Sequence, residues 1–378
     1  MIAIFRFSLR HLALFSACTA LAVASAGCGG GSSSLSTSPQ TIGGLNTIAT
    51  LSSTVDVANG DNNPYPIAIA PPKSTTFPGD GVSGHIQPGD VVVGNFSNSA
   101  GTQGAGTTYE DVSTGKPVNV FTEPAGTAGG PAAFAFNTGA GYLWTANAGL
   151  LNSASPGNVQ IVSPSGALVN TLTAPAIQYG WGQAYNNDFG GKGAFFSVNL
   201  STGTIVRINV VAGAGGVTFT YDTLASGLAA TLSGFGGTGV GPAGMVDTST
   251  DTLYVVDSDN NTIYSISNAS TVAAATGLTN AKVVYSDPNG TYLSQPVGLA
   301  LNPINGDLIT CNQKNNNLVE INPNTGKVVA VKTVDPAVVQ SNGTGSALFG
   351  VAATTDSSGN LKVYFTDDNT NTVNTLSK

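Results

Sequence analysis

The stretch Gln295–Val331, which reads QPVGLALNPINGDLITCNQKNNNLVEINPNTGKVVAV, decides the fold of this chain. Apolar residues alternate with small ones from Val297 to Leu301, and Asn305-Gly306 then supplies a tight turn. Alternation followed by Asn-Gly is typical of a β-hairpin. Two further apolar segments, at 308–311 and 318–321, lead through a polar turn into a fourth at 328–331. The stretch therefore predicts a unit of four short antiparallel strands.

The same unit recurs along the chain. A small residue, a middle residue that is usually apolar, and a third residue that is usually Ala form a motif at six places: Pro66-Ile67-Ala68, Ala133-Phe134-Ala135, Gly182-Gln183-Ala184, Gly244-Met245-Val246, Gly298-Leu299-Ala300 and Gly350-Val351-Ala352. Each motif precedes a β segment that ends in a polar residue: Asn95, Asn147, Asn199, Asp257, Asn312 and Asp367. The steps between these residues are 52, 52, 58, 55 and 55. Four-stranded repeats of about this length are typical of β-propeller blades.

The two ends of the repeat region complete each other. The last unit has only three β segments before Lys378. Residues 46–51 alternate apolar and polar residues as a strand does, and they belong to none of the other units. Pairing of these segments would close the ring and leave no free sheet edge. We therefore predict an all-β domain over residues 46–378, a six-bladed propeller of four-stranded antiparallel blades that an N-terminal strand closes in the last blade.

The repeat resembles that of NHL-type six-bladed propellers, in which Pro-x-Gly-x-Ala precedes Gly-x-Leu-x-Val-x-Asp-x-x-Asn-x-x-Ile. The match is closest over Pro296–Ile321, and Asp257, Asn260 and Ile263 carry it in the preceding unit. The basic residue that is common after the second Asn is absent, because Thr262 and Asn317 stand in its place.

The N-terminus is typical of an exported protein. Arg6 and Arg10 precede an apolar segment at 12–26, which predicts a signal peptide over residues 1–27. Ser25-Ala26-Gly27-Cys28 resembles a bacterial lipobox, although Ser25 stands where Leu is usual. Lipidation of Cys28 and a Gly/Ser-rich tether over 28–45 would make the chain a membrane-anchored lipoprotein.

The residue after Cys28 bears on where that lipoprotein would lie. Gly29 favours the outer membrane, with the domain facing the periplasm or the cell surface. The alternative is cleavage after Ala24-Ser25-Ala26, which would give a soluble secreted or periplasmic protein.

Composition excludes several functions. Without Arg6 and Arg10, the 12 basic residues become 10 against 20 acidic ones, so the mature chain has a net charge of about −10 and nucleic-acid binding is disfavoured. His85 is then the only histidine and Arg207 the only arginine, which excludes histidine-cluster metal sites and arginine clamps. Cys311 is the only cysteine of the domain, and we interpret it as an apolar strand residue.

Two sets of residues are candidates for a site. The residues that end the second β segments either cap their own turns or offer oxygen atoms to a hard cation such as Ca²⁺, with Asn147, Asn199 and Asp257 as the metal candidates. Tyr65, Trp181 and Phe349 precede the small residue of three inner motifs and either pack between blades or line one mouth of the channel. With Asn95, Asn312 and Asp367 they form the candidates for a channel mouth.

These observations favour a non-catalytic binding or scaffolding module, without a cofactor, that acts as a monomer on a protein or glycan ligand. The alternative is a divalent-metal-dependent lactonase or hydrolase, because calcium lactonases of the gluconolactonase type resemble this chain in blade number and in residue type. Four long loops are the candidate ligand loops: 71–89, 97–106, 225–241 and 335–346.

Overall fold

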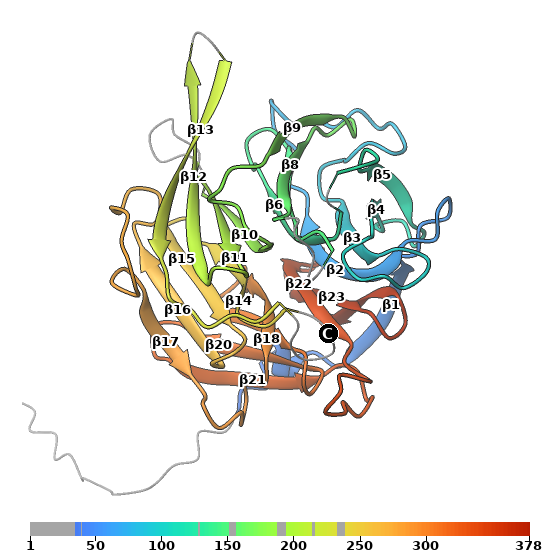
Figure 1. Ribbon diagram of the computed structural model, residues 1–378. Helices are drawn as coiled ribbons and strands as arrows, with labels where there is room; N and C mark the ends of the chain where they lie inside the picture. Colours follow the sequence, from blue (N-terminus) through green and yellow to red (C-terminus); the bar gives the residue numbers. More distant parts are fainter. Residues whose placement is uncertain are drawn as a thin grey trace, which may run out of the picture. The chain divides into compact units, whose positions relative to one another are not determined.

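The computed structural model describes residues 35–378 apart from residues 39, 128, 151–155, 187–193, 214–215 and 233–238. The signal peptide, Cys28 and the start of the tether lie outside the described residues. Leu35–Lys378 forms one compact unit, in which the strands make six four-stranded antiparallel sheets arranged as a ring (Figure 1). The predicted six-bladed β-propeller is confirmed.

The blades follow the chain in order. Blade 1 holds β2 (Asn62–Ile69), β3 (Val91–Ser97), β4 (Thr108–Asp111) and β5 (Val118–Thr122), and blade 2 holds β6 (Pro131–Phe136), β7 (Leu143–Asn147), β8 (Asn158–Val162) and β9 (Leu168–Leu172). Blade 3 holds β10 (Gly180–Asn186), β11 (Ala194–Asn199), β12 (Thr204–Gly213) and β13 (Gly216–Ala225), and blade 4 holds β14 (Pro242–Asp247), β15 (Thr252–Asp257), β16 (Thr262–Ser267) and β17 (Lys282–Ser286). Blade 5 holds β18 (Pro296–Leu301), β19 (Leu308–Asn312), β20 (Asn317–Asn322) and β21 (Lys327–Thr333).

Blade 6 joins the two ends of the domain. It holds β22 (Leu348–Thr355), β23 (Leu361–Asp367), β24 (Thr372–Ser377) and β1 (Thr47–Ser53), in the order β1-β24-β23-β22. The register pairs Thr47 with Ser377 and Ser53 with Thr372. The N-terminal strand thus takes the predicted place beside the last strand, and the ring has no gap.

The small residues of the repeat lie where neighbouring inner strands approach each other. A Cβ atom on Gly298 would lie 2.6 Å from the carbonyl oxygen of Phe349, and one on Gly244 would lie 2.4 Å from that of Val297. Gly182 and Gly350 face the inner strand of the next blade in the same way. Because no side chain fits at these contacts, the glycines let the six inner strands converge on the axis.

One expectation about the N-terminal region differs from the structure. The tether was expected to continue to residue 45, yet residues 35–38 and 40–45 lie along blade 5 and form a strap that includes the 3-10 turn η1 (Ile42–Gly44). Ile42 and Leu45 are fully buried, and Glu320 accepts a hydrogen bond from the Ile42 backbone N–H at 2.8 Å. Burial of these two apolar side chains outweighs the flexibility that the Gly/Ser-rich composition suggested.

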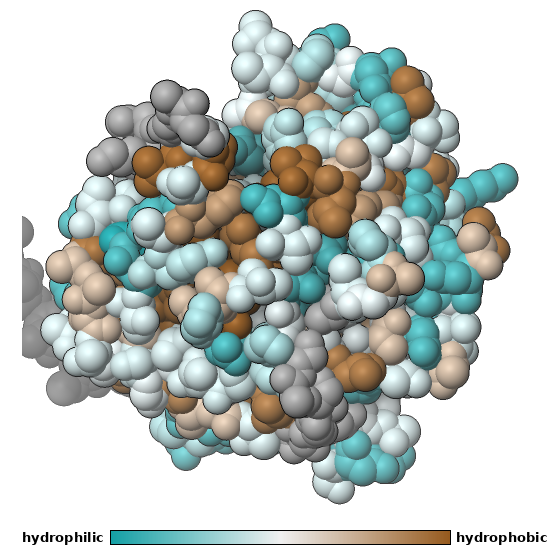
Figure 2. All heavy atoms as spheres, turned by 45° about the horizontal axis from the view of Figure 1, so that its top comes forward, coloured by the Kyte–Doolittle hydropathy of each residue, from teal (hydrophilic) through white to brown (hydrophobic). Residues whose placement is uncertain are grey.

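The surface is mixed in polarity. On the face shown in Figure 2, apolar residues lie in separate small patches among polar ones. Blade 3 differs from the others, because β12 and β13 extend beyond the ring as a long hairpin (Figure 1). No helix among the described residues is long and apolar enough to cross a membrane.

Candidate functional site

The axial channel is narrow, and most of the side chains that line it are apolar. The inner strands line a cavity of about 60 Å³, which has room for a few water molecules. Gln183 brings a carboxamide to this cavity; it is 4% exposed, and neither of its amide atoms has a hydrogen-bond partner among the described residues. No described carboxylate, histidine or lysine lines the cavity.

The three aromatic residues predicted at a channel mouth lie together in a buried cluster. Tyr65 stacks between Phe96 and Phe349, with ring centroids 4.1 Å and 3.8 Å apart. Trp181 meets all three rings edge to face, at centroid distances of 5.4 to 6.1 Å. Each of the four side chains is at most 4% exposed, so their rings pack against one another across the axis.

The asparagines at the ends of the second strands make hydrogen bonds to the segments that lead into the inner strands of their own blades. The Nδ2 atoms of Asn95, Asn199 and Asn312 donate to the carbonyl oxygens of Thr54, Ala176 and Tyr292, at 2.6 to 2.8 Å. Asn147 Oδ1 instead accepts a hydrogen bond from the Tyr109 hydroxyl at 3.1 Å, and Asn147 Nδ2 donates one to Asn158 Oδ1 at 3.0 Å. These side chains are therefore engaged within or beside their own blades.

The two aspartates at the same position cap turns. Asp257 accepts the backbone N–H groups of Asp259 and Asn260, and Asp367 accepts that of Thr370. The metal candidates Asn147, Asn199 and Asp257 belong to three different blades, and each makes hydrogen bonds of its own. No group of three or more His, Cys, Asp or Glu side chains among the described residues is arranged to hold a metal ion.

A polar pocket lies between blades 6 and 1, on the face of the ring where the inner strands begin and the second strands end. Its volume is about 470 Å³, within the range of small-molecule sites. The lining residues come from the start of β2, the loop after β3, the loop before β22 and the turn between β23 and β24: Asn62, Asn63, Ser97, Gly101, Gln103, Asn342, Gly343, Thr344, Gly345, Ser346, Asp368, Asn369 and Asn371. Two of the four long loops expected to bind a ligand thus meet at one pocket.

Two of the lining residues each have a buried side-chain oxygen atom that lacks a donor. Asn63 donates its Nδ2 to Ser97 Oγ at 2.9 Å and its backbone N–H to Asn371 Oδ1 at 2.8 Å, but its Oδ1 has no partner. Asp368 donates its backbone N–H to Ala347, and its Oδ1 also has no partner. A buried acceptor without a donor costs free energy. Because both atoms have almost no solvent-accessible area, they lie behind the surface of the pocket and not on it.

The loops that form the walls are held in place. Asn369 Nδ2 donates to the carbonyl oxygen of Gly345 and to Asp335 Oδ2, both at 3.1 Å, and Asn316 Nδ2 reaches the same carbonyl at 2.8 Å. On the opposite wall, the Asn98 side chain accepts the backbone N–H groups of Ala100 and Thr102. The pocket is therefore largely formed before a ligand arrives.

The electrostatics of the pocket centre on Asp368. Burial raises the pKa of its carboxyl to about 7, and the charges of Asp367 and Asp335 act in the same direction. Burial also raises the pKa of the Tyr65 hydroxyl, and the charge of Asp368 adds to that rise. Asp368 thus lies close enough to the aromatic cluster for its charge to act on the Tyr65 hydroxyl.

Two other buried carboxyl groups lie within blade 1. Burial raises the pKa of Glu110 and of Glu123 to about 8. Asn119 Nδ2 donates hydrogen bonds to both Glu110 and Asp56. Glu123 accepts hydrogen bonds from the Tyr109 hydroxyl at 3.0 Å and from Gln160 Nε2 at 3.1 Å. Both groups sit in hydrogen-bonded networks between secondary-structure elements, away from the polar pocket.

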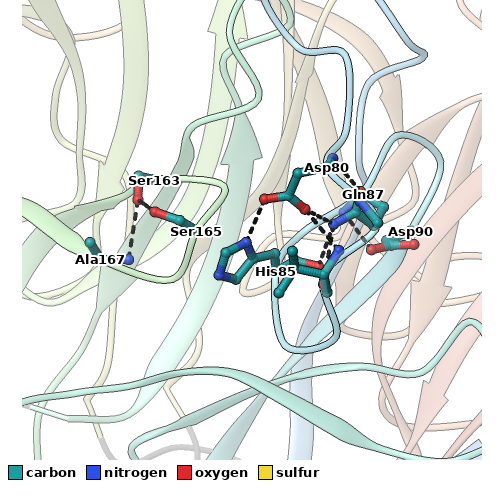
Figure 3. A network of polar contacts seen from close by, with 9 residues as sticks. Asp80, His85, Gln87, Asp90, Ser163, Ser165 and Ala167 are labelled. Carbon is teal, nitrogen blue, oxygen red and sulfur yellow. Dashed lines mark hydrogen bonds and ion pairs between the residues drawn. The ribbon is translucent and has the colours of Figure 1, made fainter.

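His85 belongs to the long loop of blade 1 (Figure 3). Its Nδ1 lies 2.6 Å from Asp80 Oδ2, and Gln87 Nε2 donates to the other oxygen of Asp80 at 2.8 Å. The backbone N–H of Ile86 donates to Pro164 and joins this loop to the turn that holds Ser163 and Ser165. The contacts of His85 therefore close the loop on itself, and the Ile86 backbone attaches the loop to blade 2.

Sequence reasoning identified the loops of the polar pocket but missed its key side chains. Asn63 and Asn371 have left-handed backbone conformations, with φ of 63° and 53°. A non-glycine residue in this conformation is most often Asn or Asp, so the repeated Asn at the turn after the second strand was the available signal. Asp368 carried no signal of its own, because adjacent Asp residues are common in exposed turns.

The fold defines the class of this protein as a six-bladed β-propeller. No protein-family model and no curated protein matches the chain. A solved structure of virginiamycin B lyase from Staphylococcus aureus, a catalytically inactive variant, is 12% identical, with a TM-score of 0.50, over 88% of this chain and 99% of that one. An auxiliary nutrient binding protein and a protein of unknown function from Bacteroides thetaiotaomicron are each 12% identical over 87% of this chain and 75% of theirs, with TM-scores of 0.51 and 0.54. At this identity the likeness concerns the fold alone.

Proposed function

We propose that this protein is an exported, lipid-anchored propeller that binds a small polar ligand between blades 6 and 1 without transforming it. The observation that carries the proposal is a preformed pocket of about 470 Å³ whose lining side chains are polar throughout, with one carboxyl group, that of Asp368. Such a lining offers hydrogen-bond donors and acceptors to a small polar molecule.

The lining supports binding rather than turnover. Asp368 is the one titratable side chain among the described lining residues, and the others are Asn, Gln, Ser, Thr and Gly. General acid–base and nucleophilic mechanisms place a second titratable or activated group within hydrogen-bond reach of the first. The NHL-like repeat adds to the proposal. Its inner strands carry small residues and pack closely at the axis, so a binding site is left to the loops on one face of the ring.

The anchor rests on Cys28 and the residues around it. The lipobox-like Ser25-Ala26-Gly27-Cys28 and the Gly/Ser-rich residues that follow would place the propeller close to a membrane. An outer-membrane lipoprotein facing the periplasm or the cell surface is the location that we propose.

The experiment that tests the binding function is a thermal-shift screen of the purified protein against small polar compounds. We expect at least one compound to raise Tm in a saturable manner, to lose this effect in Asp368→Asn, and to be recovered chemically unchanged. Conversion of the compound by the wild-type protein, lost in the same variant, would show an enzyme instead.

A further inference from the structure

β13 presents a sheet edge that the rest of the described chain covers only in part. It is the outer strand of blade 3 and has 10 residues, whereas the outer strands of the other blades have 5 to 7. Together with β12 it extends beyond the ring (Figure 1). We propose that residues 216–222 of β13, the free edge, pair antiparallel with the same residues of a second copy of this chain. This surface is separate from the polar pocket, so the dimer does not depend on the proposed ligand.

The backbone contacts of β13 show which of its residues point toward the open side. The carbonyl oxygen of Thr223 accepts the backbone N–H of Ala275 at 3.0 Å, so the Thr223 backbone points away from β12. In an antiparallel pair, residues alternate between pointing toward the neighbouring strand and away from it. The pairing of β13 with β12 has no register shift between residues 216 and 223. Tyr221, Phe219 and Val217 therefore share the orientation of Thr223, and each offers one N–H and one C=O group at the free edge.

The free edge lacks the features that usually protect such edges. Natural proteins cover exposed edges, shorten them, or place Lys or Pro on them. In blade 5 the strap covers part of β21, because the Ser36 backbone N–H donates to the Val329 carbonyl oxygen at 2.7 Å. On β13, no other described segment makes a backbone hydrogen bond to residues 216–222, and residues 216–221 include no charged residue and no Pro. The free edge is therefore open to a strand from outside the chain.

One register lets two copies of the free edge pair through all three outward residues. Phe219 then lies opposite the partner's Phe219, and Val217 opposite the partner's Tyr221, which gives about six backbone hydrogen bonds around a two-fold axis. Aromatic and β-branched side chains stabilise a sheet when they form such cross-strand pairs. A shift of register toward the ring would need Thr223, whose carbonyl oxygen already has a donor.

The charges of the free edge suit a pairing with itself. Asp222 is its one charged residue, and in this register it lies opposite the partner's Gly216. Its Oδ2 already pairs with Arg207 at 2.6 Å and accepts a hydrogen bond from Asn209 Nδ2 at 2.8 Å. Like charges directly opposite each other destabilise a strand pair, and this register places none opposite.

The interface is small, so we expect a weak and reversible dimer. Stable complexes usually bury about 1,200–2,000 Å² of total surface, and one pair of short strand segments buries less. Two-fold pairing uses the same edge on both copies, so the assembly stops at two chains. A membrane anchor at Cys28 would raise the local concentration and favour the dimer. A dimer departs from the monomer that the sequence favoured.

The sharpest test is a disulfide between two different positions. In the proposed register Thr218 lies opposite the partner's Thr220, with Cα atoms about 4.5 Å apart, whereas identical positions lie about 7–8 Å apart, too far for a disulfide. Thr218→Cys and Thr220→Cys are made separately in a chain whose Cys18 and Cys28 are replaced by Ser, so that it carries no lipid. The remaining Cys311 is buried. We expect mild oxidation to cross-link a mixture of the two variants and to leave each variant alone uncross-linked.

Two exposed valines on outer strands form a matched pair for measurements in solution. Val217 is 55% exposed on the free edge, and Val283 is 60% exposed on β17. In the same unlipidated chain we expect Val217→Asp to weaken dimerisation at least tenfold, because the added carboxylate would face the partner's Tyr221 beside the partner's Asp222. Val283→Asp adds the same charge and should dimerise as the unlipidated parent does. Analytical ultracentrifugation over a range of concentrations measures both, and circular dichroism checks that both variants fold.

Any of three results would overturn the proposal. A chain that stays monomeric at every concentration, without a cross-link in the mixture, leaves the free edge to a strand of a different protein. Equal dimerisation of Val217→Asp and Val283→Asp places the contact on another surface. Cross-linking of Thr218→Cys with itself as readily as with Thr220→Cys contradicts the two-fold register.

Discussion

Asn371 in blade 6 holds Asn63 in blade 1 across the point where the ring closes. The side-chain oxygen of Asn371 accepts the backbone N–H of Asn63 at 2.8 Å. The same link joins Asn261 to Gln295 at 2.8 Å, and Asn316 to Ala347 at 3.0 Å. An Asn in the left-handed turn after the second strand therefore ties its blade to the inner strand of the next.

We expect Asn371→Ala to lower the free energy of unfolding by about 1–3 kcal/mol. The substitution leaves the partly buried N–H of Asn63 without its acceptor and places alanine at a positive φ. Denaturant unfolding measures the change. Asn324→Ala, at an exposed turn, is the matched control and should stay within about 0.5 kcal/mol of the wild type. Equal stability of Asn371→Ala and the control would show that the link does not stabilise the closed ring.

The glycines at the axis give a second prediction. Gly298→Ala would place a Cβ atom 2.6 Å from the Phe349 carbonyl oxygen and 2.9 Å from Cys311 Sγ. We expect it to destabilise the protein by about 1–3 kcal/mol, because the neighbouring inner strand must shift. Gly139→Ala is the control, since its Cβ would meet only Asn137 Oδ1, at 3.4 Å. An unchanged Tm for Gly298→Ala would contradict close contact between the inner strands.

The axial glycines and the closing strand show how far the sequence predicts the structure. The small residues at Gly182, Gly244, Gly298 and Gly350 recur at a constant place in the repeat, so they predict the inner strands and the number of blades. Closure by residues 46–51 followed from a count of strands. Both features depend on local patterns that repeat.

Other features depend on contacts between distant segments, and the sequence did not predict them. The strap is held by Glu320 and by the burial of Ile42 and Leu45, although its composition is that of a linker. The polar pocket joins Asn63 to Asp368, which are 305 positions apart and come together only when the ring closes. A residue without a repeated pattern gives no local signal of such a partner.

The buried carboxyl groups of blade 1 predict an unusual dependence of stability on pH. The pKa of Glu110 and of Glu123 is about 8 in the folded protein and about 4.5 in the unfolded chain. Between these values the folded state binds more protons, so the free energy of unfolding falls as pH rises from 5 to 8. We expect a loss on the order of 2 kcal/mol per group.

The variant Glu110→Gln tests the cause of this dependence. Its carboxamide mimics the protonated carboxyl, which faces Asp56 and Asn119. We expect a smaller loss of stability between pH 5 and pH 8 and a higher Tm than the wild type at pH 8. A wild-type Tm that is constant or rises over this range would show that these groups are charged in the folded protein.

The proposed anchor predicts that Cys28→Ser releases the protein from the membrane. Without the thiol no lipid can be attached, and no helix among the described residues can take over the anchoring. Cell fractionation measures the change, together with incorporation of labelled palmitate. Cys18→Ser, within the predicted signal peptide, is the matched control and should leave the protein in the membrane fraction. Soluble wild-type protein would point to ordinary signal cleavage.

The central claim is that the polar pocket between blades 6 and 1 binds a small polar ligand. The most direct measurement is a pair of binding isotherms, for the wild type and for Asp368→Asn, with the compound that raises Tm most in the thermal-shift screen. The account predicts saturable binding to the wild type and at least a tenfold higher Kd for the variant. Identical isotherms, with both proteins folded by circular dichroism, would contradict it.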